Sequence, residues 1–211
     1  MNLAILIVTC DKDSYIWDTW YYYFKKNFPQ GIGKLYWTNE TIDCPYPEFT
    51  QIKVDIKNIN KWTKGVRQVV KKISEDNILF LLGDLLLIEQ CYEFHRLCIH
   101  FTNFNMDALQ IMKSTSKLLK DEPTHIPRLT KLKKYSWYLI SYSVNLYKKK
   151  FLLECLRMTY SPWDSEIKGT RRLWIKAFLG RKYKIYNYRK NWVVNLIIRG
   201  EIDKRHKKYI K

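Results

Sequence analysis

The sequence predicts an α/β fold in which a mostly parallel central sheet is flanked by helices. The first indication is the apolar run at residues 78–88, ILFLLGDLLLI, which only Gly83 and Asp84 interrupt. Such a run is typical of a strand buried on both faces at the centre of a parallel sheet. The second indication is the order of the segments up to residue 112, β-α-β-β-α-β-α-β, because this alternation is typical of parallel strands joined by helical crossovers.

Apolar periodicity and turn-forming residues define the elements of the N-terminal half. The apolar residues of segment 61–74 recur at helical spacing, and the aromatic-rich segment 15–28 has the pattern of an amphipathic helix that ends before Pro29. Short apolar segments between turns indicate strands. In chain order we expect a strand at 3–8, a helix at 15–28, strands at 34–38 and 51–56, a helix at 61–74, the central strand in the run 78–88 with Asp84 at its carboxyl end, a helix at 89–101 and a strand at 106–112.

The C-terminal half is expected to begin with a basic, proline-containing loop over the sheet at residues 113–134. A helix should begin after Ser161, because serine is a good N-cap, Pro162 suits the first helical position and acids fill the first turn. The remaining expectations are a strand at 137–144, a helix at 147–159, a strand-like segment at 182–190 and a frayed basic tail at 204–211.

The chain is strongly basic, with 38 Lys and Arg against 20 Asp and Glu and a formal net charge of +18. Its partners are therefore expected to be anionic: nucleic acid, nucleotide phosphates or an acidic membrane surface. Charge alone does not choose among them. Part of the basicity is also explained by composition, because the lysines are spread widely.

The cysteines and histidines indicate neither a disulfide framework nor a metal cluster. The five cysteines are an odd number without a C-x-x-C pair, as expected of reduced core residues in a cytoplasmic protein. The four histidines form no metal-ligand pattern. The apolar residues 3–8 have no basic leader and are too few to span a membrane, so we expect neither a signal peptide nor a transmembrane segment.

Four motifs, in the same order along the chain, resemble those of small glycosyltransferases of the GT-A type. They are T-C-D-K at 9–12 followed by an aromatic helix, N-K-W-T-K at 60–64, L-L-G-D-L-L-L at 81–87 and S-P-W-D-S-E at 161–166. The last is similar to an S-P-W-x-x-E element of that family. Members occur in bacterial surface-polysaccharide clusters and in large DNA viruses, and the nearest resemblance is to the N-terminal glycosyltransferase domain of chlorella-virus capsid-glycosylating proteins.

The resemblance implies that a nucleotide sugar lies across the carboxyl ends of the first strands, where open α/β sheets bind ligands. Thr9, Cys10 and Asp11 would line the base and ribose, although they also suit a simple capped turn. Lys64 and Arg67 would reach the diphosphate. Solvated surface charge is the alternative for either one. Trp62 and Gly83, which lie within the matching motifs, are assigned to the same site.

Asp84 is the expected metal ligand. In the family, an acidic group at this place holds Mn²⁺ or Mg²⁺, which bridges the two phosphates and neutralises the leaving nucleotide. The sequence departs from the family here, because Gly83 precedes Asp84 and Leu86 stands where the second acid of D-x-D is usual. One carboxylate still suffices when phosphates and water supply the other ligands. The alternative is an aspartate that caps the next element.

Glu166 is the expected catalytic base, and Asp164 is the second candidate. An inverting transferase needs a carboxylate that takes the proton from the attacking hydroxyl as it displaces the nucleoside diphosphate. Glu166 closes the S-P-W-x-x-E element. Both acids also suit the start of a helix, together with Ser161. Trp163 either stacks on a sugar face or belongs to the core.

We therefore expect one GT-A-like domain over residues 1–211, with a nucleotide-sugar-binding half at 1–112, an acceptor-side half at 113–203 and a basic tail at 204–211. The expected activity is inverting, metal-assisted transfer of a hexosyl group from a UDP-sugar to a glycan or glycoprotein acceptor, such as a surface polysaccharide or a viral capsid protein in the host cytoplasm. Contact with an anionic membrane surface is compatible with this activity.

The competing function is a basic nucleic-acid-binding domain without catalytic activity. The net charge and the interleaved aromatic and basic residues of segment 182–190 suggest it. Against it, no RRM, KH, zinc-finger or helix-turn-helix signature is present. Carboxylates at the strand ends would also repel phosphate unless a metal intervenes.

Overall fold

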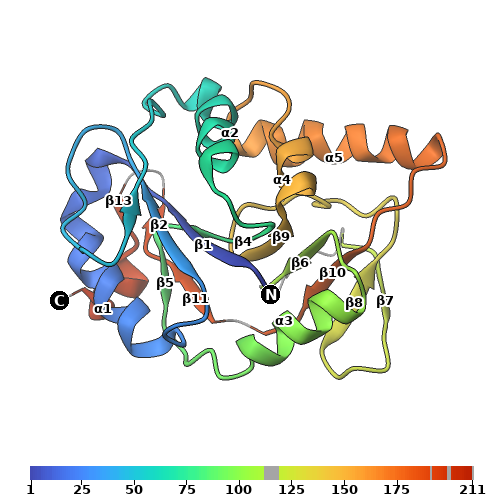
Figure 1. Ribbon diagram of the computed structural model, residues 1–211, viewed down its shortest axis with the longest axis horizontal. Helices are drawn as coiled ribbons and strands as arrows, with labels where there is room; N and C mark the ends of the chain where they lie inside the picture. Colours follow the sequence, from blue (N-terminus) through green and yellow to red (C-terminus); the bar gives the residue numbers. More distant parts are fainter. Residues whose placement is uncertain (112–118, 191, 199–200, 211) are drawn as a thin grey trace.

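The computed structural model describes residues 1–111, 119–190, 192–198 and 201–210. The strands of its main sheet are β1 (Leu3–Val8), β2 (Lys34–Thr38), β3 (Thr50–Gln51), β4 (Asn77–Leu82), β6 (Ala108–Gln110), β7 (Asp121–Pro123), β8 (Leu129–Leu132), β9 (Asn145–Lys148) and β10 (Ile185–Tyr188). Their order is β3-β2-β1-β4-β9-β6-β10-β8-β7 (Figure 1). The half from β3 to β4 is parallel, and so is the pair β6 and β10, whereas the other pairs are antiparallel. The expected α/β class is confirmed.

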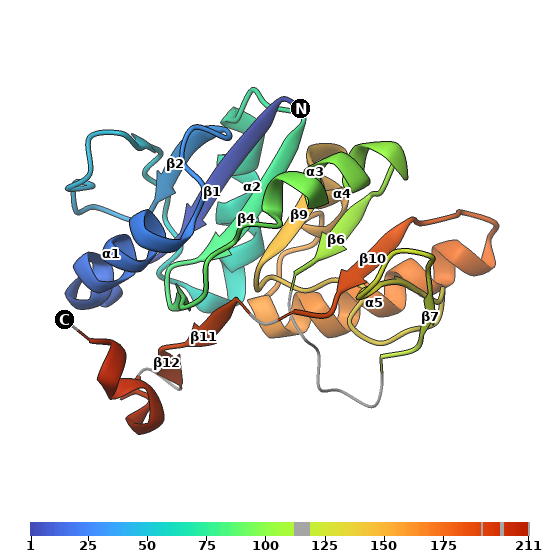
Figure 2. The same ribbon diagram turned by 90° about the horizontal axis from the view of Figure 1, so that it is seen from below.

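Helices cover both faces of this sheet (Figures 1 and 2). Helices α1 (Trp17–Asn27) and α3 (Phe94–Asn103) lie on one face, and α2 (Trp62–Lys72), α4 (Lys149–Cys155) and α5 (Pro162–Phe178) lie on the other. The odd-numbered residues of β1 pack in the core with α1 and α3, and the even-numbered residues pack in the core with α2, α4 and α5. Because both faces are buried, the strand has no polar alternation.

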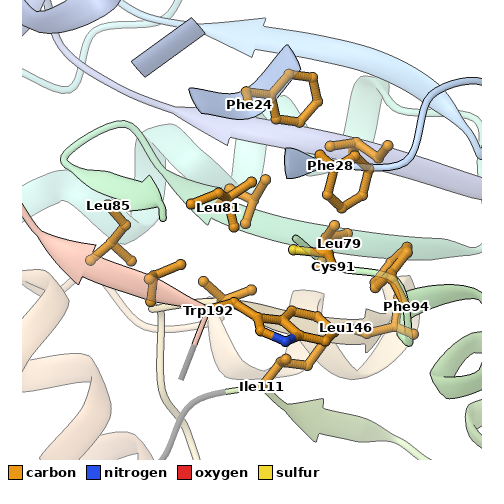
Figure 3. Packing of buried hydrophobic residues seen from close by; sticks show 14 of the residues in the cluster. Phe24, Phe28, Leu79, Leu81, Leu85, Cys91, Phe94, Ile111, Leu146 and Trp192 are labelled. Carbon is orange, nitrogen blue, oxygen red and sulfur yellow. The ribbon is translucent and has the colours of Figure 1, made fainter. Parts of the chain in front are cut away.

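The C-terminal part of the chain completes the core on the α1 and α3 side. Figure 3 shows Trp192 among Phe94, Leu146 and Ile111, with Phe24 and Phe28 further along the same cluster. Directly after Trp192, strand β11 (Val193–Asn195) pairs antiparallel with β5 (Leu85–Leu87). The shorter elements are η1 (Asp11–Ile16), η2 (Ile59–Lys61), η3 (Lys204–Tyr209) and the paired strands β12 (Ile197–Ile198) and β13 (Glu201–Ile202).

The N-terminal expectations are largely confirmed. The strands expected at 3–8 and 34–38 match β1 and β2, and the helix expected at 61–74 is α2 with the preceding turn η2. The strand expected at 51–56 is reduced to the two residues of β3. The central strand of the run 78–88 is β4, and Asp84 lies just beyond its carboxyl end, as expected. The chain turns at Gly83 and Asp84, and the rest of the run forms the short strand β5.

Two C-terminal expectations are wrong. Residues 137–144 form turns instead of a strand, and the strand begins only at Asn145. Their apolar side chains are buried by packing rather than by strand pairing, and Tyr138 has a φ of +55°, which is incompatible with an extended strand. The loop expected at 113–134 contains β7 and β8 at the sheet edge. Residues 112–118, on which parts of the expected strand and loop fall, lie outside the described residues.

The basic end of the chain is not frayed up to residue 210. Its η3 turn is capped by Asp203, whose side chain accepts a hydrogen bond from the backbone N–H of Arg205 at 3.0 Å. The ring of Tyr209 packs edge-on against Tyr23 of α1, with 5.9 Å between the ring centroids. Lys211 lies outside the described residues. Across the described part of the chain, no helix combines the length and the apolar character needed to cross a membrane.

Candidate active site at the carboxyl edge of the sheet

Four chain segments meet at one edge of the sheet. Strands β1, β2 and β4 are parallel neighbours, so the residues that follow each of them leave the sheet side by side. The fourth segment precedes β9, which pairs antiparallel with β4 so that Asn145 lies opposite Phe80. Residues just before Asn145 therefore emerge at the same edge as residues just after Leu82. This is the position at which open α/β sheets bind ligands.

Gly83 allows the ends of β1 and β4 to come together. Its backbone N–H donates to the carbonyl of Val8 at 2.8 Å. A Cβ atom at position 83 would lie 2.6 Å from the Cβ of Thr9, so the position has no room for a larger residue. The hydroxyl of Thr9 accepts a hydrogen bond from the indole N–H of Trp17 at 3.0 Å. Thr9 and Gly83 thus form the packed floor of the edge.

Asp84 follows this junction and carries a buried oxygen without a partner. Its Oδ1 has no hydrogen-bond partner among the described residues. Burial raises the pKa of Asp84 to about 6, and the negative charge of Asp13 adds to the rise. A buried carboxylate oxygen without a donor is costly unless a proton or a cation completes it. The backbone carbonyl of Asp84 accepts from the N–H of Leu196 at 2.8 Å, which fixes the turn.

The donor set at Asp84 fits a divalent cation shared with a ligand. Hard cations prefer carboxylate oxygens, and the unpaired Oδ1 supplies one. Within the described ranges no group of three or more His, Cys, Asp or Glu side chains lies close enough together to hold a metal ion. Most of the coordination would therefore come from phosphate oxygens and water.

The carboxylate of Asp11 holds the loop after β2. It accepts hydrogen bonds from the side-chain amide of Asn39 at 2.6 Å and from the backbone N–H groups of Glu40 and Thr41 at 3.1 and 2.8 Å. Burial alone would raise its pKa, but hydrogen bonds from Thr41 and Asn39 outweigh burial, so the pKa of Asp11 lies well below its ordinary value. Asp11 therefore holds the loop after β2 against the end of β1, where the nucleotide base is expected to bind.

Glu40 and Cys10 lie beside Asp11 at the same edge. Glu40, which the sequence reasoning missed, accepts from the backbone N–H of Asp11 at 2.6 Å, and burial raises its pKa. The thiol of Cys10 donates to Asp13 at 2.9 Å. Burial, followed by this hydrogen bond, raises the pKa of Cys10 and keeps it a thiol. An acidic residue two positions after a short parallel strand was the available sequence signal for Glu40.

Helix α2 begins at the same edge, and Lys64 and Arg67 lie on its first two turns. The hydroxyl of Thr63 donates to the carbonyl of Met158 at 2.7 Å and accepts from the N–H of Tyr160 at 2.8 Å, which ties α2 to the segment before α5. Lys64 is exposed on the first turn. Arg67 is half-buried, and its Nε is buried without a hydrogen-bond partner in the described part of the chain.

Glu166 is half-buried on the first turns of α5. Ser161 caps the helix, because its hydroxyl accepts from the N–H of Asp164 at 3.1 Å. The Oε1 atom of Glu166 accepts from the backbone N–H of Tyr142 at 2.8 Å. Burial raises the pKa of Glu166 to about 7, although the Tyr142 amide and the Ser141 side chain stabilise the ionised form. Glu166 is therefore poised to exchange a proton near neutral pH.

Asp164 and Trp163 lie on the outer side of the same helix. The Oδ1 of Asp164 is 3.0 Å from the Nζ of Lys168, and the side chain of Asp164 is 45% exposed. The hydrogen bond from Lys168 lowers the pKa of Asp164, so this acid stays ionised and holds protons weakly. Trp163 is 66% exposed and is not a core residue. The geometry brings Glu166, rather than Asp164, to the inner side.

Tyr142 contacts α2, β4 and α5, and the sequence analysis did not identify it. The centroid of its ring lies 5.0 Å from the ring centroid of Trp62 and 5.7 Å from that of Phe80. Its hydroxyl is 2.8 Å from the hydroxyl of Ser165. Trp62 is only 5% exposed and thus belongs to the core beneath the edge. No sequence signal marked Tyr142, because its segment had the apolar pattern of a strand.

The chain matches no family model, and no similar protein was found among curated sequences. Solved structures do match. The S. aureus glycosyltransferase TarS, residues 1–349, has a TM-score of 0.57 at 13% identity over 92% of this chain. The same fragment in complex with UDP-GlcNAc has a TM-score of 0.57 at 10% identity over 92% of this chain. The bifunctional IspDF of Campylobacter jejuni has a TM-score of 0.56 at 11% identity over 100% of this chain.

These likenesses show the fold. The chain has a GT-A-like fold of the type found in nucleotide-diphospho-sugar transferases. It spans 60%, 58% and 54% of the three matched chains. These bacterial neighbours do not support the expected link to chlorella viruses.

Proposed function

We propose that this chain is a glycosyltransferase that moves a sugar from a UDP-linked donor to a hydroxyl group of a glycan acceptor, with inversion of the anomeric centre. The observation that carries the proposal is the pair of half-buried carboxyl groups at the carboxyl edge. Asp84 has an unpaired oxygen, and Glu166 has a pKa raised to about 7. The fold supports the proposal, because TarS has been crystallised with UDP and with UDP-GlcNAc.

In this proposal the nucleotide lies across the ends of β1, β2 and β4. Thr9, Cys10 and Asp11 form the wall beside the base and ribose, and Asp11 holds the loop after β2 in place. Arg67 would bind the diphosphate, since an anionic oxygen would complete its buried Nε. Lys64 on the preceding turn would add positive charge. Residues 1–112 would thus form the donor half and residues 113–203 the acceptor half.

Asp84 is the residue that would hold Mn²⁺ or Mg²⁺. When bound, such a cation would neutralise the charge that develops on the departing nucleoside diphosphate. The contribution of the chain is a rigid carboxylate. The turn at Asp84 is fixed by Gly83 packing on Thr9 and by the hydrogen bond from Leu196.

Glu166 is the proposed base that takes the proton from the acceptor hydroxyl. Its pKa of about 7 suits proton acceptance near neutral pH. The Tyr142 amide orients the carboxylate through Oε1. Glu166 also favours transfer to a hydroxyl group over transfer to an acceptor that is already ionised, because only the hydroxyl needs a base.

Calorimetric titration of UDP with and without Mn²⁺ tests the donor site. The wild-type chain should bind UDP in a metal-dependent manner. The Asp84→Asn variant should bind roughly tenfold more weakly or not at all, because the amide cannot replace the charged ligand. The matched control is Asp164→Asn, which removes an exposed carboxylate and should leave UDP binding unchanged.

Two results would contradict the proposal. Absence of UDP binding by the wild-type chain, with and without metal, would exclude the transferase function. Unchanged metal-dependent binding by Asp84→Asn would keep the nucleotide site but place the metal elsewhere.

A further inference from the structure

The outer face of α5 is apolar, although its inner face already packs on the molecule. The buried residues of the helix are Ser165, Gly169, Thr170 and Leu173. Large apolar side chains recur on the opposite side at helical spacing and continue to the C-cap. They are Trp163, Ile167, Ile175, Phe178 and Leu179, with exposed fractions of 66%, 39%, 62%, 79% and 75%. We call these five residues the outer face of α5.

This degree of exposure is concentrated on one helix. Among the described residues, Tyr92 is the one large apolar side chain outside α5 and its C-cap that is more than 60% exposed. Single exposed apolar residues are normal on protein surfaces. A cluster of them, such as Ile175, Phe178 and Leu179 at the end of α5, is typical of a surface that contacts a partner.

The surroundings of this face are positively charged. Residues 167–184 contain seven Lys and Arg and no Asp or Glu. Lys168 pairs with Asp164 at 3.0 Å, and Lys176 and Arg181 pair with Glu154 at 2.6 and 2.7 Å. The other cations, which include Arg171 and Lys182, form no ion pair with the described residues and leave net positive charge beside the apolar row.

The C-terminal end of α5 also protrudes. Figures 1 and 2 both place this end of the helix, drawn in orange, at one extremity of the long axis. A protruding helix end with exposed apolar side chains can enter an apolar environment while the rest of the fold stays in water.

We infer that the outer face of α5 lies on an anionic membrane surface. Ile175, Phe178 and Leu179 would enter the boundary between headgroups and acyl chains, and Arg171 and Lys182 would contact the lipid phosphates. Charge complementarity selects this occupant, because an anionic bilayer presents negative charge and an apolar layer in the same plane. The net charge of +18 favours the same approach.

The inference does not depend on the proposed activity. If both hold, they combine geometrically, because Glu166 lies on the same helix 12 residues before Phe178, about 18 Å along the axis. An acceptor held at the membrane would then approach the proposed base.

Co-sedimentation with lipid vesicles tests the inference. One set of vesicles is phosphatidylcholine alone, and the other contains about one-third phosphatidylglycerol, to supply the anionic surface. The wild-type chain should sediment with the anionic vesicles. The triple variant Ile175→Ser, Phe178→Ser, Leu179→Ser should bind roughly tenfold more weakly or less. The matched control Tyr92→Ser, which removes an equally exposed ring elsewhere, should bind as the wild type does.

Two double charge-reversal variants test whether binding depends on the cations beside this face or on the net charge of the whole chain. Arg171→Glu with Lys182→Glu should weaken vesicle binding strongly. Lys71→Glu with Lys72→Glu makes the same charge change on exposed residues of the last turn of α2 and should have a small effect. Thermal unfolding and UDP titration of every variant show whether the fold and the donor site are retained.

Several results would overturn the inference. They are no binding of the wild type to anionic vesicles at low ionic strength, unchanged binding of the triple serine variant, or equal loss of binding in the two charge variants. A wild-type dimer that becomes monomeric in the triple serine variant, without vesicle binding, would identify a second copy of the chain as the occupant instead.

Discussion

Asp84 and Glu166 are both half-buried, but their surroundings differ. Glu166 receives a hydrogen bond from the Tyr142 amide at 2.8 Å, so its ionised form has a partner. The buried Oδ1 of Asp84 has none among the described residues. A carboxylate with one fixed donor is suited to gain and lose a proton, whereas one without a donor is suited to a cation. The difference in environment is the physical basis for giving the two acids different roles.

The raised pKa of Glu166 predicts a pH-dependent stability. Its pKa is about 7 in the folded chain against an ordinary 4.5, so the folded state binds more protons between these values. The wild type should therefore lose stability as the pH rises through this window, by about 3–4 kcal/mol at most from this group. In Glu166→Gln the side chain does not titrate, so this loss should be absent. Urea unfolding of both proteins at several pH values measures the difference.

Asp164→Asn is the control for this prediction, because Asp164 is an exposed acid on the same helix. It should follow the wild-type pH dependence through the window. Parallel stability curves for the wild type and Glu166→Gln would show that Glu166 is solvated and titrates normally.

At the scale of elements, Gly83 decides how closely β1 and β4 meet beyond the sheet. In Gly83→Ala the new methyl group would lie 2.6 Å from the Cβ of Thr9, so the two strand ends must separate. We expect a loss of about 1–3 kcal/mol in the free energy of unfolding, as for other overpacked sites. Because the shift also moves Asp84, UDP binding in the presence of Mn²⁺ should weaken. Urea unfolding and calorimetric titration measure the two effects.

The control for Gly83→Ala is Thr9→Ser, which keeps the hydroxyl that accepts from Trp17. It removes a methyl group without adding volume and leaves a hydroxyl in the nucleotide wall, so UDP binding should weaken much less than in Gly83→Ala. Full stability and wild-type binding in Gly83→Ala would mean that the turn can relax without moving Asp84.

Elements with strong local signals were predictable from the sequence. β1 and β2 are short apolar runs between turns, and α5 begins where Ser161 and Pro162 predict a helix start. Elements that depend on distant partners were not. Residues 137–144 have strand-like apolar residues, but Ile140 is buried against Gly169 of α5, where a Cβ would lie 2.7 Å from it. That contact depends on tertiary structure, which a local pattern does not contain.

Some residues of the candidate site were likewise predictable from the sequence, and others were not. Asp84 stood out because a charged residue interrupts an apolar run, and Glu166 because it closes a motif at a helix start. The roles of Asp11 and Trp62 were not visible. Asp11 binds a loop about thirty residues later in the chain, and Trp62 packs on Tyr142, eighty residues later. Sequence spacing gives no information on such contacts.

The molecule as a whole is basic, with a net charge of +18, but the candidate site is locally acidic. The carboxyl edge carries the acids Asp11, Asp13, Glu40 and Asp84 close together, as their hydrogen bonds and mutual effects on pKa indicate. The cations lie mainly over the rest of the surface, including the segment after Glu166. A polyanion is therefore attracted to the outside of the molecule, whereas a nucleotide at the edge needs a cation beside the acids in addition to Lys64 and Arg67.

This contrast separates the transferase from the competing nucleic-acid-binding domain. A single-stranded oligonucleotide should bind the chain through diffuse charge and lose affinity by roughly a thousandfold between about 50 and 200 mM salt, as for several phosphate contacts. UDP with Mn²⁺ should retain most of its affinity over the same range and should not displace the oligonucleotide. Fluorescence polarisation of a labelled oligonucleotide, with UDP and Mn²⁺ as competitors, measures both. Oligonucleotide binding that survives high salt and depends on base sequence would instead favour the nucleic-acid function, because diffuse charge cannot produce either property.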